Sequence, residues 1–218
     1  MKTLIRLALA ALVALPGTAL RSESLDKLIP DAAEILGRMK REDIINMDLV
    51  KEAKGIVIIN VTGFSIGIGG SGGDGILMSK TEKGWSGPVA ITTQGGTLGI
   101  DVGGQDNDIV MLLMNNGVVS RWAAGEHFSS SSASAVLGPK GGAAVDATMK
   151  TRDFNVYIWN KGAKLGVNFG GFDVSINNEA NANYYDRPLV SAKDILNNVA
   201  EVPESKKAPM ARIYDLLK

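Results

Sequence analysis

A dense run of glycines follows a β-branched apolar segment, and these two features together limit the fold more than any other part of the chain. Residues 55–61 have the Ile and Val content of a buried strand. The glycines that follow are Gly63, Gly67, Gly69, Gly70, Gly72, Gly73 and Gly75. A helix could hold so many glycines only at a large entropic cost. We therefore expect a strand, a glycine-rich extended hairpin, and a return to strand over residues 76–79.

Strand patterns continue through the middle of the chain, with turn residues between them. They recur about every 8–12 residues, a spacing typical of a sheet-rich domain. The Asn115-Asn116-Gly117 segment predicts a hairpin turn, because Asn-Gly tolerates positive φ at both central positions. The strands that we predict are 55–61, 65–69, 75–79, 89–93, 98–102, 109–114, 118–122, 143–149, 155–159, 164–168 and 173–176.

Helical patterns lie at both ends of the chain. We expect Asp31, which comes just after Pro30, to cap a helix with Glu34 three residues later. Its apolar stripe is Ala32, Ile35, Leu36 and Met39. A short helix is expected over 48–53, another over 192–199 capped by Ser191, and a last one after a linker at 203–209, with its stripe on Met210, Ile213, Tyr214 and Leu217. The fold prediction is α+β, mainly β: one antiparallel, sheet-rich domain with N-terminal and C-terminal helices.

The first residues have the pattern of a signal peptide. Lys2 and Arg6 precede an apolar stretch at residues 7–15, and Gly17-Thr18-Ala19 fits the small-x-small cleavage rule. We expect an exported protein, periplasmic or secreted, whose mature form begins at Leu20. The predicted division is a signal peptide at 1–19, a helical segment at 20–49, a β-rich domain at 50–200, and a linker and helix at 201–218.

Composition limits the partners and the chemistry. The chain has no cysteine, which excludes a disulfide framework and a zinc-thiolate site. Without Lys2 and Arg6 it carries 21 basic and 23 acidic residues, and it lacks the clustered basic footprint of a nucleic-acid-binding protein. After the signal peptide, no apolar run reaches the length of a membrane span.

Three motifs suggest catalysis or ligand binding, and each lacks the structure that its chemistry needs. A nucleophile elbow at residues 63–67 would place Ser65 before a helix, whereas more glycines and a strand follow here. A dinucleotide loop on Gly67, Gly69 and Gly72 would also need a helix. The acidic residues Asp101, Asp106 and Asp108 lack the spacing of a calcium loop. We expect no enzyme activity, cofactor, metal or small-molecule substrate, and we expect Gln105 and Asp108 to bond backbone groups at a turn.

A set of short motifs resembles the SYLF domain, a lipid-binding module of eukaryotic membrane-trafficking adaptors and bacterial envelope proteins. The resemblance covers about residues 50–196. The motif residues, which we expect to be mainly structural, are Gly55, Gly63, Phe64, Gly73, Trp85, Ser86, Pro88, Gln105, Asp108, Gly138, Pro139, Tyr157, Gly162 and Tyr185, with Asn181-Ala182-Asn183 before the last of them. The resemblance implies a non-enzymatic protein that lies peripheral to an envelope membrane and binds anionic or phosphoinositide-type headgroups of its phospholipids.

Basic residues beside the N-terminal stripe are the first candidates for contact with those headgroups. They are Arg38, Lys40, Arg41, Lys51 and Lys54, followed by Lys140 and Lys161 in glycine-flanked turns. The alternative is that the stripe packs on the sheet, as most amphipathic helices of globular domains do. Residues 20–54 carry 7 basic and 8 acidic groups, so the segment as a whole is not basic. The competing functions are a structural or partner-binding scaffold and, third, a serine esterase.

Overall fold

A computed structural model describes residues 23–64, 70–95, 98–100, 105–128, 133–137, 153–160, 167–169 and 172–218. Several predictions lie outside these residues: the signal peptide and its cleavage site, the strands at 65–69 and 143–149, Ser65, Gly138, Pro139, Lys140, Lys161 and Gly162.

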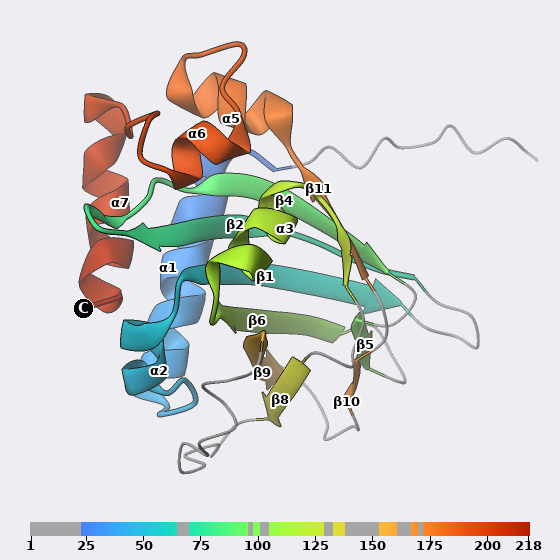
Figure 1. Cartoon of the computed structure of the whole chain (residues 1–218). Coiled ribbons are helices and arrows are strands. Elements are labelled where there is room, and N and C mark those ends of the chain that lie inside the picture. The colour runs from blue at the N-terminus through green and yellow to red at the C-terminus, as the bar shows by residue number, and fades with distance from the viewer. Residues whose placement is uncertain are drawn as a thin grey trace, which may run out of the picture.

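One large sheet dominates the molecule and confirms the predicted fold class (Figure 1). Its order is β7-β11-β4-β2-β1-β6-β9-β8, with the short β3 paired to β2, and β5 and β10 form a separate pair. Every pairing is antiparallel except β8 with β9. The strands are β1 (Gly55–Phe64), β2 (Gly70–Thr81), β3 (Gly84–Trp85), β4 (Val89–Gly95), β5 (Leu98–Ile100), β6 (Gln105–Leu113), β7 (His127–Phe128), β8 (Ala133–Leu137), β9 (Phe154–Asn160), β10 (Val167–Phe169) and β11 (Phe172–Ile176).

The described glycines of this segment lie in two paired strands, as the predicted hairpin requires. Strands β1 and β2 pair from Gly55 opposite Ser79 to Phe64 opposite Gly70. A side chain at Gly73 would overlap the Asn60 carbonyl oxygen, so the backbones of the two strands approach closely there. The glycines in β2 therefore allow close strand packing and do not form a phosphate loop.

Helix α1 (Leu25–Arg41) begins earlier than the sequence suggests, so the predicted cap at Asp31 is wrong. Ser24 is its N-cap residue, and Pro30 lies inside the helix. The apolar pattern already starts at Leu25 and continues through Leu28, both of which are buried. Burial of this extra turn offsets the single backbone hydrogen bond that a proline removes.

The apolar stripe of α1 is part of the core. Ala32, Ile35, Leu36 and Met39 are between 0% and 6% exposed, and the helix packs on the sheet and on α7 (Lys207–Leu216). In Figure 1, α1 crosses behind the strands, and α7 runs along its outer side. The structure therefore confirms the alternative in which this stripe packs on the sheet.

Residues 115–123 differ from the prediction. A helix, α3 (Asn116–Ala123), replaces the expected hairpin turn and the strand at 118–122. The Asn115 side chain accepts a hydrogen bond from the Val118 N–H, so it caps a helix instead of forming a turn with Gly117. Val118, Val119 and Trp122 then share one buried helix face.

The remaining helices are α2, which comes just before β1, and those near the C-terminus. The short α2 (Met47–Glu52) and the Ser191 cap of α6 (Ala192–Leu196) confirm their predictions, although α6 ends before residue 199. Helix α5 (Asn178–Tyr185) was not expected, and a single 3-10 turn (Glu204–Lys206) precedes α7. The predicted stripe is confirmed, since Met210, Ile213 and Leu217 are buried and Tyr214 is partly buried against the core. The predicted linker at 203–209 is too long, because α7 already begins at Lys207.

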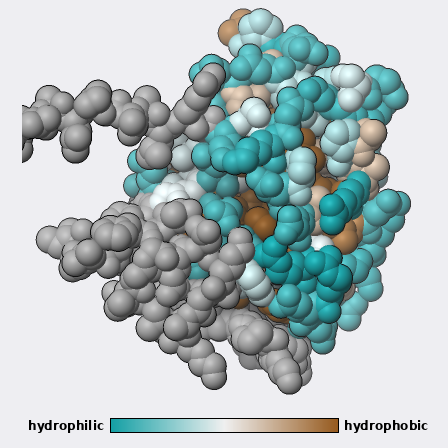
Figure 2. All heavy atoms as spheres, turned by 180° about the vertical axis from the view of Figure 1, so that it is seen from behind, coloured by the Kyte–Doolittle hydropathy of each residue, from teal (hydrophilic) through white to brown (hydrophobic). Residues whose placement is uncertain are grey.

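Within the described ranges, no helix is both long and apolar enough to cross a bilayer. The same residues contain no group of three or more His, Asp or Glu side chains placed to hold a metal ion. From behind, the part of the surface that is described is largely hydrophilic, and apolar side chains show only in small areas between polar ones (Figure 2).

Candidate functional site

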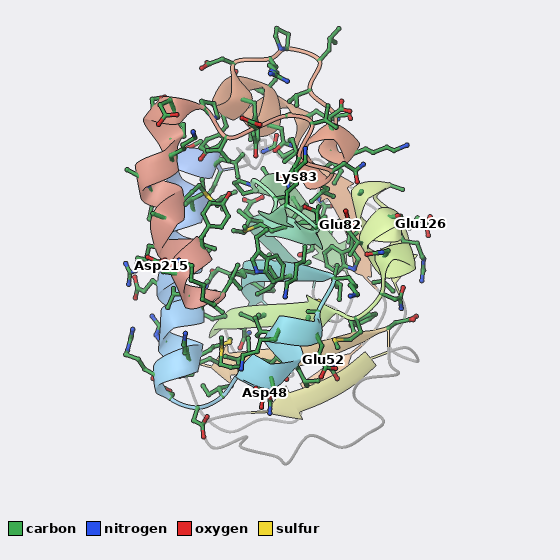
Figure 3. All side chains as sticks on the ribbon, turned by 60° about the vertical axis from the view of Figure 1, so that its left-hand side comes forward. Asp48, Glu52, Glu82, Lys83, Glu126 and Asp215 are labelled. Carbon is green, nitrogen blue, oxygen red and sulfur yellow. The ribbon has the colours of Figure 1, made fainter. Side chains whose placement is uncertain are left out.

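A groove lined by four lysines, with a volume of about 1100 Å³, is a candidate site among the described residues. It lies between the end of α2, the β2–β3 turn, α3 and α6. Figure 3 shows this side of the molecule, and its labels Glu82 and Lys83 mark the β2–β3 turn. We call it the lysine groove. Its lining consists of Lys51, Lys54, Ser79, Lys80, Thr81, Glu82, Asn116, Val119, Ser120, Ala123, Ala124, Lys193, Leu196 and Asn197.

Hydrogen bonds hold the walls of the lysine groove in place. The Ser79 hydroxyl, 6% exposed, donates to the Leu196 carbonyl oxygen and so ties β2 to α6. The Asn198 amide donates to the Thr81 hydroxyl at 2.8 Å, which fixes the turn after α6 to the same strand. The groove is thus preformed, a property that lowers the ordering cost of binding.

Two of the lysines are cross-strand neighbours. The Lys80 N–H donates to the Lys54 carbonyl oxygen at 2.8 Å, which extends the β1–β2 register by one residue beyond Gly55 and Ser79. Like charges placed opposite each other on neighbouring strands destabilise a sheet. An anion bound between Lys54 and Lys80 would relieve that repulsion.

The other contacts leave the groove with an excess of positive charge. The Lys80 ammonium donates to the Lys51 carbonyl oxygen at 2.6 Å and lies 5.7 Å from the centre of the Trp85 ring. Lys51 pairs with Asp48 at 2.9 Å. Lys54 and Lys193 are exposed and form no ion pair with another described residue. Glu82 is the single acidic residue of the lining, so the groove favours a negatively charged ligand.

The predicted headgroup residues separate into three places. Lys51 and Lys54 line the groove. Lys40 and Arg41 lie at the C-terminal end of α1, where the Lys40 ammonium donates to the Leu216 carbonyl oxygen at 3.3 Å.

Arg38 lies elsewhere, against the sheet. Its guanidinium forms ion pairs with Asp108 and with Glu34, and it stacks 4.3 Å from the centre of the Trp159 ring. Headgroup binding by Arg38 would have to compete with these contacts.

Asp108 does not bond backbone groups at a turn, so that expectation is wrong. It lies inside β6, 2% exposed, and accepts a hydrogen bond from the Asn60 amide at 2.8 Å besides the one from Arg38. Because a buried carboxylate needs charged or polar donors, the strand interior can hold it only with these two partners. Gln105 pairs with Gly63 in the β1–β6 ladder.

The tryptophan-serine-glycine-proline motif at residues 85–88 has a structural role. The buried Ser86 hydroxyl accepts from the Ser79 N–H at 3.0 Å. The Tyr185 hydroxyl of α5 donates to the Pro88 carbonyl oxygen at 3.0 Å, and a side chain at Gly87 would overlap that hydroxyl. Asn181, also on α5, accepts from the Ala90 N–H at 2.8 Å. These motif residues therefore fasten α5 to the start of β4.

The described residues beside the two catalytic motifs lie in strands. Phe64 ends β1 opposite Gly70 in β2, so the serine motif lies between two paired strands where a nucleophile elbow needs a strand and a helix. Gly72 lies inside β2, where a dinucleotide loop would need a helix to begin.

Comparison with known families now identifies the chain. The family model Ysc84, described as "Las17-binding protein actin regulator", matches residues 94–218. The chain belongs to the Ysc84 family. This family is the SYLF domain, so the sequence resemblance is confirmed.

Relatives from yeast and vertebrates match a longer part of the chain. Protein YSC84 of Saccharomyces cerevisiae is 29% identical over 180 residues, which are 80% of this chain and 38% of that protein. SH3 domain-containing YSC84-like protein 1 is 25% identical over 196 residues in Mus musculus and 26% over 175 in Homo sapiens; the alignments cover 88% and 78% of this chain. They cover 56% and 51% of those proteins, so this chain spans about half the length of the vertebrate relatives.

Sequence reasoning missed Lys80 and Lys193 as site residues. The signal for Lys80 was present, because the predicted β1–β2 hairpin places it opposite Lys54. Lys193 carried no such signal. It joins the groove only because α6 docks on β2, more than a hundred residues earlier in the sequence.

Proposed function

We propose that this Ysc84-family chain binds the anionic headgroups of membrane phospholipids in the lysine groove, as an exported protein peripheral to an envelope membrane. The observation that carries the proposal is the gathering of Lys51, Lys54, Lys80 and Lys193 around one preformed hollow with a single acidic residue, Glu82. Each lysine near an anionic membrane surface contributes about 1 kcal/mol to the free energy of membrane binding.

The polar lining supports a phosphate-containing headgroup in particular. Ser120 and Asn116, from α3, and Asn197, after α6, offer hydroxyl and amide groups beside the lysines. Ammonium groups bind phosphate as point charges, and neutral donors then fix its orientation. The hydroxyl-bearing headgroup of phosphatidylglycerol has the matching chemistry.

Sedimentation with vesicles tests this proposal. The triple variant Lys54→Gln, Lys80→Gln, Lys193→Gln should bind phosphatidylglycerol-containing vesicles about 100-fold more weakly at low salt, from about 1 kcal/mol for each lysine. The difference should shrink as added salt screens the charges. All three changes are on exposed or half-exposed side chains, so the melting temperature should change little.

A matched variant removes the same charge elsewhere. Lys40→Gln, Arg41→Gln, Lys218→Gln changes the end of the molecule where α1 and α7 finish. The proposal expects this variant to bind vesicles nearly as well as the unmodified protein. Equal losses in both triple variants would show a diffuse attraction without a groove site.

We also propose that the chain is not an enzyme. The family is described as a Las17-binding actin regulator, and one yeast relative is named as a LAS seventeen-binding protein. Phe64 and Gly70, on either side of Ser65 in the sequence, belong to paired strands. Ser65→Ala should leave any esterase background of the purified protein unchanged; loss of a robust activity in this variant alone would overturn the proposal.

A protein partner is the second candidate function. LAS seventeen-binding protein 3 of Saccharomyces cerevisiae, 28% identical over 180 residues, carries a protein-binding function in its name. A chain that only scaffolds a partner would fail to sediment with anionic vesicles at any salt concentration, which separates this function from lipid binding.

A further inference from the structure

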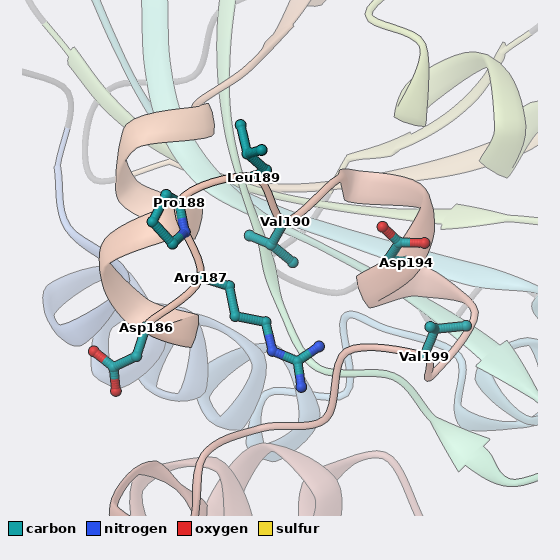
Figure 4. A pocket seen from close by; sticks show the side chains of 7 residues that line it. All are labelled: Asp186, Arg187, Pro188, Leu189, Val190, Asp194 and Val199. Atoms are coloured by element: carbon teal, nitrogen blue, oxygen red, sulfur yellow. The ribbon is translucent and has the colours of Figure 1, made fainter.

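A second hollow lies on the other side of α6 from the lysine groove. It has a volume of about 510 Å³ and is formed by the α5–α6 loop and the turn after α6. Figure 4 shows Leu189 and Val199 on it, with Pro188 and Val190 between α5 and α6.

Its two aliphatic side chains are unusually exposed. Leu189 is 96% exposed and Val199 is 65% exposed. Among the described residues, these two are the large hydrophobic side chains that are exposed. Isolated exposed aliphatic residues are common, but here both lie on one hollow.

The backbone around these side chains is held by hydrogen bonds. The Val199 N–H donates to the Asp194 carbonyl oxygen at 2.8 Å, and the Val190 N–H donates to the Arg187 carbonyl oxygen at 3.2 Å. The exposure of Leu189 and Val199 is therefore a fixed feature of two short turns, and the apolar tips are displayed to the solvent.

Helix α6 links this hollow to the lysine groove. Lys193 and Leu196 line the groove, while the neighbouring Asp194 lines the hollow. The Asp194 carboxylate accepts from the Ser191 hydroxyl at 2.7 Å, so part of its charge is satisfied within the helix cap. The exposed aliphatic pair thus flanks the same five-residue helix that carries a groove lysine.

We propose that Leu189 and Val199 are membrane anchors, which enter the acyl boundary of a bilayer while the groove lysines bind its headgroups. This inference rests on the proposed lipid-binding function. A surface that joins cations to protruding apolar side chains matches the layered chemistry of a bilayer interface, which is anionic outside and apolar beneath.

A second copy of the chain fits this surface less well than a bilayer. A stable protein interface buries at least about 1,200 Å² in total, more than two aliphatic side chains on short turns supply.

Single-cysteine labelling tests the insertion directly, because the natural chain has no cysteine. Leu189→Cys and Val199→Cys, each carrying a polarity-sensitive fluorophore, should shift to the blue when phosphatidylglycerol vesicles are added, and nitroxide-labelled lipid should quench them. The control is Asp215→Cys on α7, whose side chain is 70% exposed and which should show neither change. Equal responses at all three positions would overturn the anchor.

A binding experiment separates this inference from the proposed function. Leu189→Ser with Val199→Ser should weaken vesicle binding by about tenfold or more, as expected from lost burial of two aliphatic side chains, and the loss should persist at high salt. Unchanged binding, together with a loss in the groove triple variant, would overturn the anchor and keep the headgroup site. Unchanged binding in both variants would overturn both proposals. A blue shift that depends on protein concentration without vesicles would show self-association and also overturn the anchor.

Discussion

Arg38 connects α1 to a carboxylate that the sheet buries. Asp108 has two side-chain donors, Arg38 and Asn60, and the aromatic ring of Trp159 covers the guanidinium. The Trp159 indole N–H in turn donates to Glu42 at 2.9 Å, just after the end of α1. This network fixes how α1 lies on β6 and β9.

The first prediction concerns the Arg38–Asp108 ion pair. Arg38→Met should lower the free energy of unfolding by about 3 kcal/mol, because it leaves the Asp108 charge buried with a single neutral donor. The double variant Arg38→Met, Asp108→Asn should recover most of that loss. Urea unfolding of the two single variants and the double variant measures the coupling; additive losses would contradict the prediction.

Neighbouring glycines of β2 provide the second prediction. A Cβ at Gly73 would overlap the Asn60 carbonyl oxygen, whereas a Cβ at Gly72 would meet the Thr93 carbonyl oxygen at 3.4 Å, an ordinary contact. Gly73→Ala should therefore lower the free energy of unfolding by about 1–3 kcal/mol, the range for overpacking. Gly72→Ala is the matched control and should be nearly neutral. Thermal unfolding that ranks the two variants equally would disagree with the close strand packing.

Among the elements, α3 is the case in which local sequence patterns predict the wrong secondary structure. Asn-Asn-Gly is a strong hairpin signal, and Val118-Val119 has strand propensity. Asn115, the first residue of that signal, is also of a type preferred at helix N-caps. Val118, Val119 and Trp122 recur with helical spacing. Burial of Trp122, which is 0% exposed, favours the helix. Tertiary packing thus outweighs propensity in this segment.

The third prediction tests the cap of α3. Asn115→Ala should lower the free energy of unfolding by about 1 kcal/mol, because the Val118 N–H loses its side-chain acceptor. The control is Asn116→Ala at the first helical position, which should have little effect because its side chain makes no capping bond. Chemical denaturation of both variants is the measurement, and a larger loss at Asn116 would contradict the assigned cap.

Elements defined by long patterns were predictable from the sequence. The glycine hairpin, the α1 stripe and the stripe on α7 each rest on several periodic residues. The start of α1 was not predictable, because Pro30 is a usual first-turn residue and only burial of Leu25 and Leu28 shows that the helix starts before it. Helix α5 was hidden by its weak apolar pattern, since it is held through Asn181 and Tyr185.

In the molecule as a whole, the fold separates basic residues that are close together in the sequence. Arg38, Lys40 and Lys51 are close in sequence, yet they lie on the sheet, beside α7 and in the groove. Conversely, Lys193 reaches the groove from the far end of the chain. Lys193 joins the other groove lysines only because α6 docks on β2, and local sequence patterns do not encode that docking.

All four tyrosines of the chain pack against this assembled core, and their burial couples stability to alkaline pH. Burial raises the pKa of Tyr157 from 10.0 to about 12. Burial also raises the pKa of Tyr184, Tyr185 and Tyr214. The protonated Tyr185 hydroxyl is the donor that fastens α5 to Pro88. The folded state therefore favours the neutral phenols that the unfolded chain loses near pH 10.

The last prediction follows from the sign of these shifts. Below about pH 10 the tyrosines are protonated in both states, so their contribution to stability is fully present and constant. As the pH rises above 10, the unfolded chain releases phenolic protons that the folded state keeps. Each such tyrosine then lowers the free energy of unfolding by about 1.4 kcal/mol per pH unit. Urea unfolding at increasing alkaline pH should show this decline.

Phenolate absorbance should appear together with the loss of folded structure, because ionisation of the buried rings requires unfolding. Tyr185→Phe removes one titrating group and should make the decline less steep, while costing some stability at neutral pH through the lost bond to Pro88. Phenolate that forms gradually near pH 10 in a chain with native circular dichroism would instead mean that water reaches the rings. The packing of α5 and α7 around Tyr184, Tyr185 and Tyr214 would then be looser than the buried side chains of these helices indicate.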